Sequence, residues 1–264
     1  MLQAFTLKFK SIDFLIFTIH SAFMPNFEIE LKSLLGSQEN ATSFLNKLKN
    51  VDKNLKLTSK NSQLNHYFIG GDINRLSVLI HEHLDEFEAQ DFHHLVNHGS
   101  NFSVRTRQLD NQIILVIKAS IDQTSSSNGT ARIEFEKKFE NMSLKDLDQL
   151  LLDTDFSYQA KWSRVREEYE FHLPHNFKSE VKLLENPKYV TVCLDKNAGY
   201  GYLTEFELVL QDISEAEAGK TFLRDLIRFL EVQELSQDKL ERMFVYYNAN
   251  WTQYYGTDKT FNLE

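Results

Sequence analysis

Short stretches in which charged and apolar residues alternate recur along the chain and predict β-strands. In the segment FEIELK, which begins at Phe27, every second residue is charged. Because strand side chains alternate between two faces, this spacing places Glu28, Glu30 and Lys32 together on one face. The pattern recurs in SVRTR (103–107), ILVIK (114–118), RIEFE (132–136), WSRVREEY (162–169) and TEFELVL (204–210). Several strands with one charged face predict a sheet that surrounds a charged lumen.

Helical periodicity separates these strands. Helices are expected at 38–49, at 144–152 with Ser143 and Asp146 as a capping box, and at 214–247 as a C-terminal pair. The insertion 72–100 is expected to hold one long and one short helix, and a further strand is expected at 62–70. The fold class is therefore α+β, with a closed or nearly closed antiparallel eight-stranded β-barrel and inserted and C-terminal helices.

Composition narrows the classes of protein to which this chain can belong. With 264 residues, 42% of them hydrophobic, the chain suits one globular domain, and its net charge of −9 excludes general binding to nucleic acids or anionic membranes. Cys193 is the single cysteine, so no internal disulfide can form. This favours a reducing compartment, and we expect a cytoplasmic protein.

The N-terminal segment needs its own interpretation. Lys8 and Lys10 precede FLIFTIHSAF, which resembles a short signal peptide but is too short to span a bilayer. We prefer Met24 as the start, because MPNFEIELK opens directly on the first strand. Residues 1–23 are then a disordered or loosely attached extension, and 24–264 form the domain.

The charged strands, in their order along the chain, resemble the motifs of the CYTH or triphosphate tunnel metalloenzyme family. That family includes class IV adenylyl cyclases, thiamine triphosphatases, inorganic triphosphatases and fungal-type RNA triphosphatases. FEIELK matches its ExExK motif, and the similarity runs from Phe27 to Leu210. The insertion 72–100 is a departure. A second departure concerns the KxR motif of the family. This chain has Arg164-Val165-Arg166 at that place, and Lys161 is a candidate for the missing lysine.

The resemblance implies a small triphosphate or nucleotide as ligand. A triphosphate carries roughly four negative charges near neutral pH, so several cations must reach different oxygens. The candidate substrate-binding residues are Lys32, Arg105, Arg107, Lys118, Arg132, Lys161, Arg164 and Arg166.

The acidic strands suit a hard divalent cation, Mg²⁺ or Mn²⁺, because such ions prefer carboxylate oxygens. The candidate metal ligands are Glu28, Glu30, Glu134, Glu136, Asp195, Glu205 and Glu207. Glu28 and Glu136 are also the candidates for the catalytic group that orients or deprotonates water, and the sequence does not choose between them.

Three functions stay open on the sequence. The first is a metal-dependent phosphohydrolase that cleaves a linear triphosphate, inorganic or carried on a small organic group. The second is an adenylyl cyclase of class IV type, although the histidine-phenylalanine pair of that subgroup is not evident before ExExK. The third is a catalytically silent polyphosphate- or nucleotide-binding module. A homodimer is left open.

Two other clusters are expected to have structural roles. The aromatic segment 246–261 is expected to pack against the barrel rather than stack on a ligand. The histidines of the insertion are expected to form a solvated surface, since no ligand set for a metal accompanies them: His81, His83, His93, His94 and His98.

Overall fold

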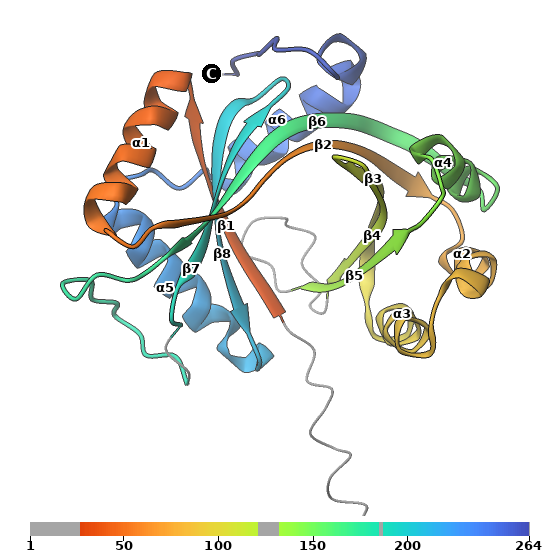
Figure 1. The fold of residues 1–264 in the computed structure, drawn as a ribbon, viewed down its shortest axis with the longest axis horizontal. Coiled ribbons are helices and arrows are strands. Elements are labelled where there is room, and N and C mark those ends of the chain that lie inside the picture. Colours follow the sequence, from red (N-terminus) through yellow and green to blue (C-terminus); the bar gives the residue numbers. More distant parts are fainter. Residues whose placement is uncertain (1–26, 121–131, 185–186, 264) are drawn as a thin grey trace, which may run out of the picture.

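The computed structural model describes residues 27–120, 132–184 and 187–263. Eight antiparallel strands form its centre (Figure 1), in the spatial order β1-β5-β4-β3-β2-β6-β7-β8. Met24 and the predicted extension 1–23 lie outside the described residues. The strands are β1 (Phe27–Gly36), β2 (Lys56–Gly70), β3 (Ser100–Leu109), β4 (Gln112–Ser120), β5 (Arg132–Phe139), β6 (Phe156–Phe171), β7 (Val190–Asn197) and β8 (Gly201–Leu210).

The sheet curls until β1 and β5, the strands at its two ends, approach each other. β1 pairs with β8 along its whole length, from Phe27 opposite Leu210 to Gly36 opposite Tyr202. On its other side β1 meets β5 at one register pair, Glu28 with Arg132. Within the described residues, the seam between β1 and β5 therefore has no continuous hydrogen-bonded ladder. The predicted eight-stranded antiparallel sheet in an α+β chain is confirmed, whereas a fully closed barrel is not.

Helices cover the outer face of this sheet. α1 and α5 pack against β1 and β8, while α3 and α4 cover the region of β3, β4 and β5, and α6 lies against β6 (Figure 1). Among the described helices, none has the length and apolar character that crossing a bilayer requires. The helices are α1 (Gln38–Val51), α2 (Ile73–Ile80), α3 (Glu86–His98), α4 (Leu144–Leu152), α5 (Ala216–Phe229) and α6 (Gln237–Asn250), with 3₁₀ turns at His81–His83, Ile213–Glu215 and Trp251–Gln253.

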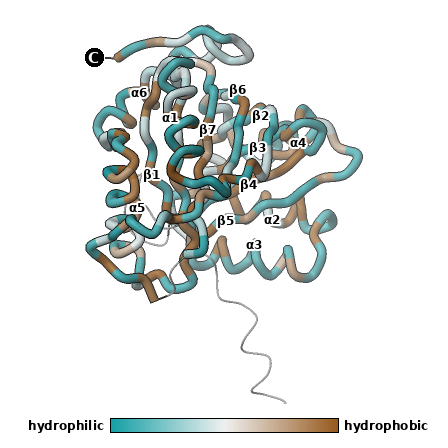
Figure 2. Tube along the Cα trace, turned by 60° about the vertical axis from the view of Figure 1, so that its left-hand side comes forward, coloured by the Kyte–Doolittle hydropathy of each residue, from teal (hydrophilic) through white to brown (hydrophobic). Residues whose placement is uncertain are grey.

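The hydrophobic core lies between the sheet and these helices, outside the lumen. On β1, Ile29 and Leu31 are fully buried and pack with Phe206 of β8 and residues of α5. The helices show the matching pattern: α3 alternates between hydrophilic and hydrophobic residues in Figure 2, and its Phe92 and Leu95 are buried. The strand alternation therefore turns the apolar side chains outward to the helices and the charged ones inward.

Most predicted elements occur within a few residues of their expected bounds. α4 begins with the predicted capping box, in which Ser143 and Asp146 satisfy each other's backbone N–H groups. The insertion holds a long and a short helix, as expected, but the short one comes first. The first helix ends at Ile80, and a new capping box formed by Asp85 and Glu88 begins α3, so the insertion contains helices of 8 and 13 residues. β2 also begins earlier than expected, at Lys56, which pairs with Glu170 of β6.

A buried polar network ties α4 to the outer face of the sheet. Asp148 of α4 lies 2.7 Å from His66 Nδ1 of β2 and accepts hydrogen bonds from Thr106 of β3 and Tyr158 of β6. On its other side, His66 Nε2 lies 2.8 Å from the hydroxyl oxygen of Tyr255. The network therefore also holds the C-terminal segment, whose aromatic side chains pack into a third core cluster, as predicted.

Candidate active site

A cavity of about 630 Å³ occupies the lumen of the curled sheet. The described residues that line it include seven carboxylates, of which Glu241 of α6 is the one outside the strands. They also include six cationic side chains, all from strands: Lys32, Arg105, Arg107, Lys118, Arg164 and Arg166.

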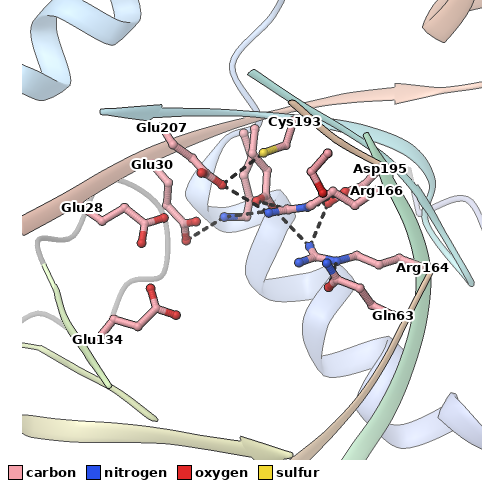
Figure 3. A network of polar contacts seen from close by, with 12 residues as sticks. Glu28, Glu30, Gln63, Glu134, Arg164, Arg166, Cys193, Asp195 and Glu207 are labelled. Carbon is pink, nitrogen blue, oxygen red and sulfur yellow. Dashed lines mark hydrogen bonds and ion pairs between the residues drawn. The ribbon is translucent and has the colours of Figure 1, made fainter. Parts of the chain in front are cut away.

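Three of the carboxylates form a compact acidic group: Glu28 and Glu30 of β1 and Glu207 of β8. One oxygen from each lies within 4.8 Å of the others. The β1–β8 ladder causes this approach, because it places Glu30 directly opposite Glu207, and Figure 3 shows the three side chains together on one side of the lumen. Such a spacing of hard oxygen ligands suits a divalent cation of the Mg²⁺ type.

The electrostatics of this group favour a cation. Burial, together with the nearby Glu28, Glu205 and Glu30, raises the pKa of Glu207 to about 8, although Arg166 opposes the rise. The raised pKa favours the protonated form of Glu207, which relieves the repulsion among the three carboxylates. A divalent cation would stabilise the same cluster in its fully ionised form.

Two lysines flank the acidic group. Lys118 Nζ of β4 lies 3.0 Å from Glu28 Oε2 and 3.0 Å from Glu134 Oε2. Burial disfavours its charge, but Glu134 and Glu28 outweigh burial and raise the pKa of Lys118, so this lysine is a permanent cation. Lys32 Nζ lies 2.8 Å from Glu30 Oε1 and 3.6 Å from Glu205.

Two arginines of β6 are fixed by a buried carboxylate of β7. Arg166 donates from Nε and Nη2 to the two oxygens of Asp195, at 2.8 and 2.7 Å. Arg164 Nη1 donates to Asp195 Oδ2 at 2.8 Å, and Figure 3 shows both guanidinium groups converging on this carboxylate. Arg166 also bonds Glu205 and lies 3.3 Å from Glu207. The pair is therefore held rigidly beside the acidic group.

The arginines of β3 lie on the other side of β2 from those of β6. Arg105 Nη1 donates to the hydroxyl oxygen of Tyr67 at 2.9 Å, and its guanidinium group lies 3.7 Å from Glu134. Arg107 Nε donates to Asn65 Oδ1 at 2.9 Å and Nη1 donates to Glu136 at 3.1 Å. Burial and the neighbouring arginines lower the pKa of Arg107, so an incoming anion would be favoured here.

The structure separates two predicted site residues from the cavity. The ammonium group of Lys161 lies over the ring of Tyr158 at 4.1 Å, and Lys161 is absent from the cavity lining, so we remove it from the substrate site. Asp195 is fully buried and both its oxygens accept hydrogen bonds from arginines, so we reassign it from metal ligand to arginine anchor. The side chain of Arg132 lies outside the described residues.

The other predicted site residues line the cavity, but they divide into groups. Glu205, Glu134 and Glu136 lie outside the compact acidic group, and each pairs with cations. Sequence reasoning missed the neutral side chains that orient the arginines: Tyr67, Asn65 and Gln63. Their alternation within SQLNHYFIG was the available signal, because residues two apart share a strand face.

The histidines of the insertion lie on an exposed surface, as expected. The rings of His94 and His98 stack at 4.3 Å on α3, and His93 hydrogen-bonds to Asn97. These contacts join neighbouring turns of one helix and do not involve the cavity.

Comparisons with known proteins give likenesses of structure only. No family model matches the sequence, and no curated protein matches it. The structure of the PH1819 protein from Pyrococcus horikoshii OT3 is similar with 18% sequence identity and a TM-score of 0.52, over 81% of this chain and 99% of that one. A Vibrio parahaemolyticus protein described as a "putative adenylate cyclase" is similar with 12% identity and a TM-score of 0.51, over 83% and 98%.

The inorganic triphosphatase NE1496 is also similar, with 15% identity over 72% of this chain and 78% of that one, but its TM-score of 0.27 carries no argument. The likeness to the first two structures extends over nearly their whole length. At these identities the likeness shows a shared fold, which is consistent with the resemblance to the CYTH or triphosphate tunnel metalloenzyme family that the strand motifs indicate.

Proposed function

We propose that this chain is a metal-dependent phosphohydrolase that cleaves a linear triphosphate inside the lumen of its sheet. One observation carries the proposal: the acidic group of Glu28, Glu30 and Glu207 lies inside a cavity whose strands also supply six cations. A metal-chelating corner beside a cationic surface suits a metal-bound polyphosphate. In this proposal the single pair between β1 and β5 marks the seam at which the sheet closes into a tunnel.

The acidic group would hold Mg²⁺ or Mn²⁺. The donor set fits either ion, because it consists of carboxylate oxygens on two paired strands, with no thiolate or imidazole among them. When bound, the ion would neutralise charge on the phosphate oxygens in the transition state. Glu207 would give up its proton on metal binding, so the protein itself supplies the ligand charge that the ion requires.

The cations would bind and orient the phosphate chain. Arg164 and Arg166 are pre-positioned by Asp195, while Arg105 and Arg107 reach in from β3, on the other side of β2. Every one of these groups is already paired with a carboxylate or a neutral acceptor. A bound triphosphate would therefore replace part of these contacts, and the two pairs of arginines would align the substrate by bidentate hydrogen bonds.

Glu136 is the better of the two candidates for orienting the attacking water. Glu28 belongs to the acidic group and would be occupied as a metal ligand, whereas Glu136 lies outside that group. Among the described residues its one ion pair is with Arg107, at 3.1 Å; its side chain is 39% exposed and lines the cavity. Exchange of that contact on substrate binding would leave a carboxylate beside the phosphate chain to accept a proton from water.

A cyclase of class IV type is the second candidate, and the likeness to the Vibrio parahaemolyticus structure favours it. Cyclisation would use the same cations and acidic group, with a ribose hydroxyl as nucleophile in place of water. A silent binding module would use the cations alone and would need no metal-dependent turnover.

Product analysis separates these functions. The protein is incubated with tripolyphosphate, thiamine triphosphate or ATP and with Mg²⁺ or Mn²⁺, and both phosphate and cyclic AMP are measured. Phosphate release that a chelator abolishes is the expected result. Cyclic AMP from ATP would establish the cyclase instead, and binding of these compounds without any product would refute both enzymes.

A further inference from the structure

From Asn61 to Tyr67, β2 has only neutral residues on the face that it turns toward the lumen, although the strands on both sides of it carry arginines. The register places each of these neutral residues directly opposite one arginine of a neighbouring strand. The four pairs are Asn61 with Arg166, Gln63 with Arg164, Asn65 with Arg107 and Tyr67 with Arg105. β2 is therefore a neutral strand between two pairs of arginines.

Two amides of β2 bind the guanidinium groups beside them. Asn65 Oδ1 accepts a hydrogen bond from Arg107 Nε at 2.9 Å, and Gln63 Oε1 accepts one from Arg164 Nε at 2.8 Å (Figure 3). Both amide residues are buried, and Asn65 is not among the residues that line the cavity. Asn65 therefore acts on a ligand in the cavity through Arg107 rather than by contact.

A chain of hydrogen bonds along β2 fixes the direction in which these amides point. Gln63 Nε2 donates to Asn61 Oδ1 at 2.8 Å, and Asn61 Nδ2 donates to Ser59 Oγ at 2.8 Å. Asn65 Nδ2 points toward Gln63 Oε1, at 3.5 Å. Because the amide N–H groups are directed along the strand, the oxygens of Gln63 and Asn65 are left for the arginines, which can only donate.

The region around β2 carries an excess of positive charge. Burial opposes ionisation of the Tyr67 phenol, but Arg105 and Arg164 outweigh burial and lower the pKa of Tyr67. Burial, together with Arg105 and Arg164, also lowers the pKa of Arg107 to about 9, although Glu136 opposes the shift. The neutral amides of β2 hold the arginines without offsetting this charge.

The two contacts of Arg107 differ in how easily a ligand can replace them. Glu136, which pairs with Nη1 at 3.1 Å, has a side chain that is 39% exposed, so an incoming phosphate can displace it. The contact of Nε with Asn65 is buried and can stay in place. Arg107 therefore remains oriented when its carboxylate partner leaves.

We propose that Asn65 is a positioning residue that makes the lumen specific for polyanions, because it fixes Arg107 through a neutral oxygen and leaves the charge of that arginine for the phosphate chain. A carboxylate at this position would hold the arginine in the same place but offset its charge. Gln63 holds Arg164 in the same way, although Asp195 already offsets part of that charge. The inference rests on the proposed function and adds β2 to the strands that determine which ligand binds.

Asn65→Asp tests charge separately from orientation. The variant keeps the shape and the acceptor oxygen for Arg107 Nε and adds one negative charge, at the cost of the 3.5 Å contact with Gln63. The Kd of tripolyphosphate is measured by calorimetry with and without Mg²⁺, and KM and kcat are measured by phosphate release with Mg²⁺. We expect Asn65→Asp to raise Kd and KM by roughly tenfold or more, with a smaller change in kcat and a Tm within about 2 °C of wild type.

Asn65→Leu makes the opposite change. Leucine is neutral and of similar size, but it leaves the Nε group of a buried arginine without its acceptor, so the variant should have a lower Tm than wild type. It should nevertheless bind tripolyphosphate more tightly than Asn65→Asp does. If the role of Asn65 were merely structural, affinity would follow stability and the order of the two variants would be reversed.

Asn46→Asp is the matched control. Asn46 is exposed on α1 and does not line the cavity, and its replacement adds the same charge to the protein. The control should leave Kd, KM and Tm unchanged.

The outcomes keep the two proposals apart. If wild type hydrolyses tripolyphosphate and Asn65→Asp binds it as tightly as wild type does, the role of Asn65 is refuted while the proposed function stands. If wild type binds tripolyphosphate without hydrolysing it, the proposed function fails, and the Kd values of the two variants then decide on Asn65 alone. Absence of binding by wild type, with and without Mg²⁺, would overturn both.

Discussion

Replacement of Asp195 by asparagine tests the role that the structure gives to this buried carboxylate. Asp195 is fully buried and accepts three N–H groups from Arg164 and Arg166, at 2.7 to 2.8 Å. Asparagine has nearly the same shape but no charge, and its amide group presents donors where the arginines also donate. The change therefore removes a negative charge and leaves the guanidinium groups of Arg164 and Arg166 close together, with less negative charge beside them to offset their repulsion.

The magnitude follows from the loss of one partner of a buried ion pair, which costs about 3 to 5 kcal/mol. Unfolding entropy scales with chain length, so in a chain of 264 residues 1 kcal/mol corresponds to roughly 2 °C in Tm. We therefore expect Asp195→Asn to melt about 6 to 10 °C below wild type. The protein should still fold, because Glu205 and Glu207 remain beside Arg166.

The assay is thermal unfolding followed by circular dichroism, with and without tripolyphosphate and Mg²⁺. A bound polyphosphate would supply new anions to the two arginines, so the ligand should raise the Tm of Asp195→Asn by more than it raises that of wild type. Asp258→Asn is the matched control. Asp258 is an exposed partner of Lys196, at 2.6 Å, and its replacement should change Tm by less than about 2 °C.

Two results would refute this reasoning. A Tm of Asp195→Asn equal to that of Asp258→Asn would show that the arginines do not depend on Asp195. A large loss of metal affinity with unchanged stability would instead return Asp195 to the metal ligands that the sequence predicted.

Four further predictions follow from the site and from the polar network of α4. Glu30→Gln should weaken Mg²⁺ binding at least tenfold with little loss of stability, which titration calorimetry measures; unchanged affinity would remove Glu30 from the metal site. Arg107→Ala should raise KM for the triphosphate more than it lowers kcat, and steady-state kinetics with wild-type KM would count against a substrate contact. Mg²⁺ should tighten tripolyphosphate binding, and tripolyphosphate should tighten Mg²⁺ binding by the same factor, so unequal factors in paired titrations would contradict a shared site. Burial opposes the charge of Asp148, but hydrogen bonds from His66, Thr106 and Tyr158 outweigh burial and lower the pKa of Asp148. The stability that ionised Asp148 contributes is therefore present above about pH 4 and is lost as pH falls further. Acid titration of the Tm should show a shallower loss for Asp148→Asn than for wild type.

Local signals predicted most of the fold. The alternation in FEIELK places Glu28, Glu30 and Lys32 on one face, and the structure confirms it, because a strand that buries one face has only one stable register. The capping box at Ser143 marks the start of α4 to the residue. Each of these features depends on residues within one element, and such features are visible in a single sequence.

Features that depend on how the strands pair were harder to predict from the sequence. The approach of Glu30 to Glu207 results from the register of β1 against β8, which no local pattern determines. For the same reason seven carboxylates were predicted as metal ligands where three come together. Lys161 is a different case. It lies three residues before Arg164 on one continuous strand, so strict alternation already places it on the opposite face, and the family pattern misled the assignment.

The lumen shows how a sheet can enclose many charges and remain stable without its ligand. Each cation that lines the cavity lies beside a carboxylate, so the charges compensate one another while their desolvation is offset by hydrogen bonds. A triphosphate alone would add an uncompensated anion to this balanced set, and a metal ion alone would add an uncompensated cation. Together their charges partly cancel, so a triphosphate that binds with the metal ion disturbs the balance of the lumen less than a triphosphate that binds alone. The same pairing of charges along the lumen therefore favours binding of the polyphosphate together with a metal ion over binding of the polyphosphate alone.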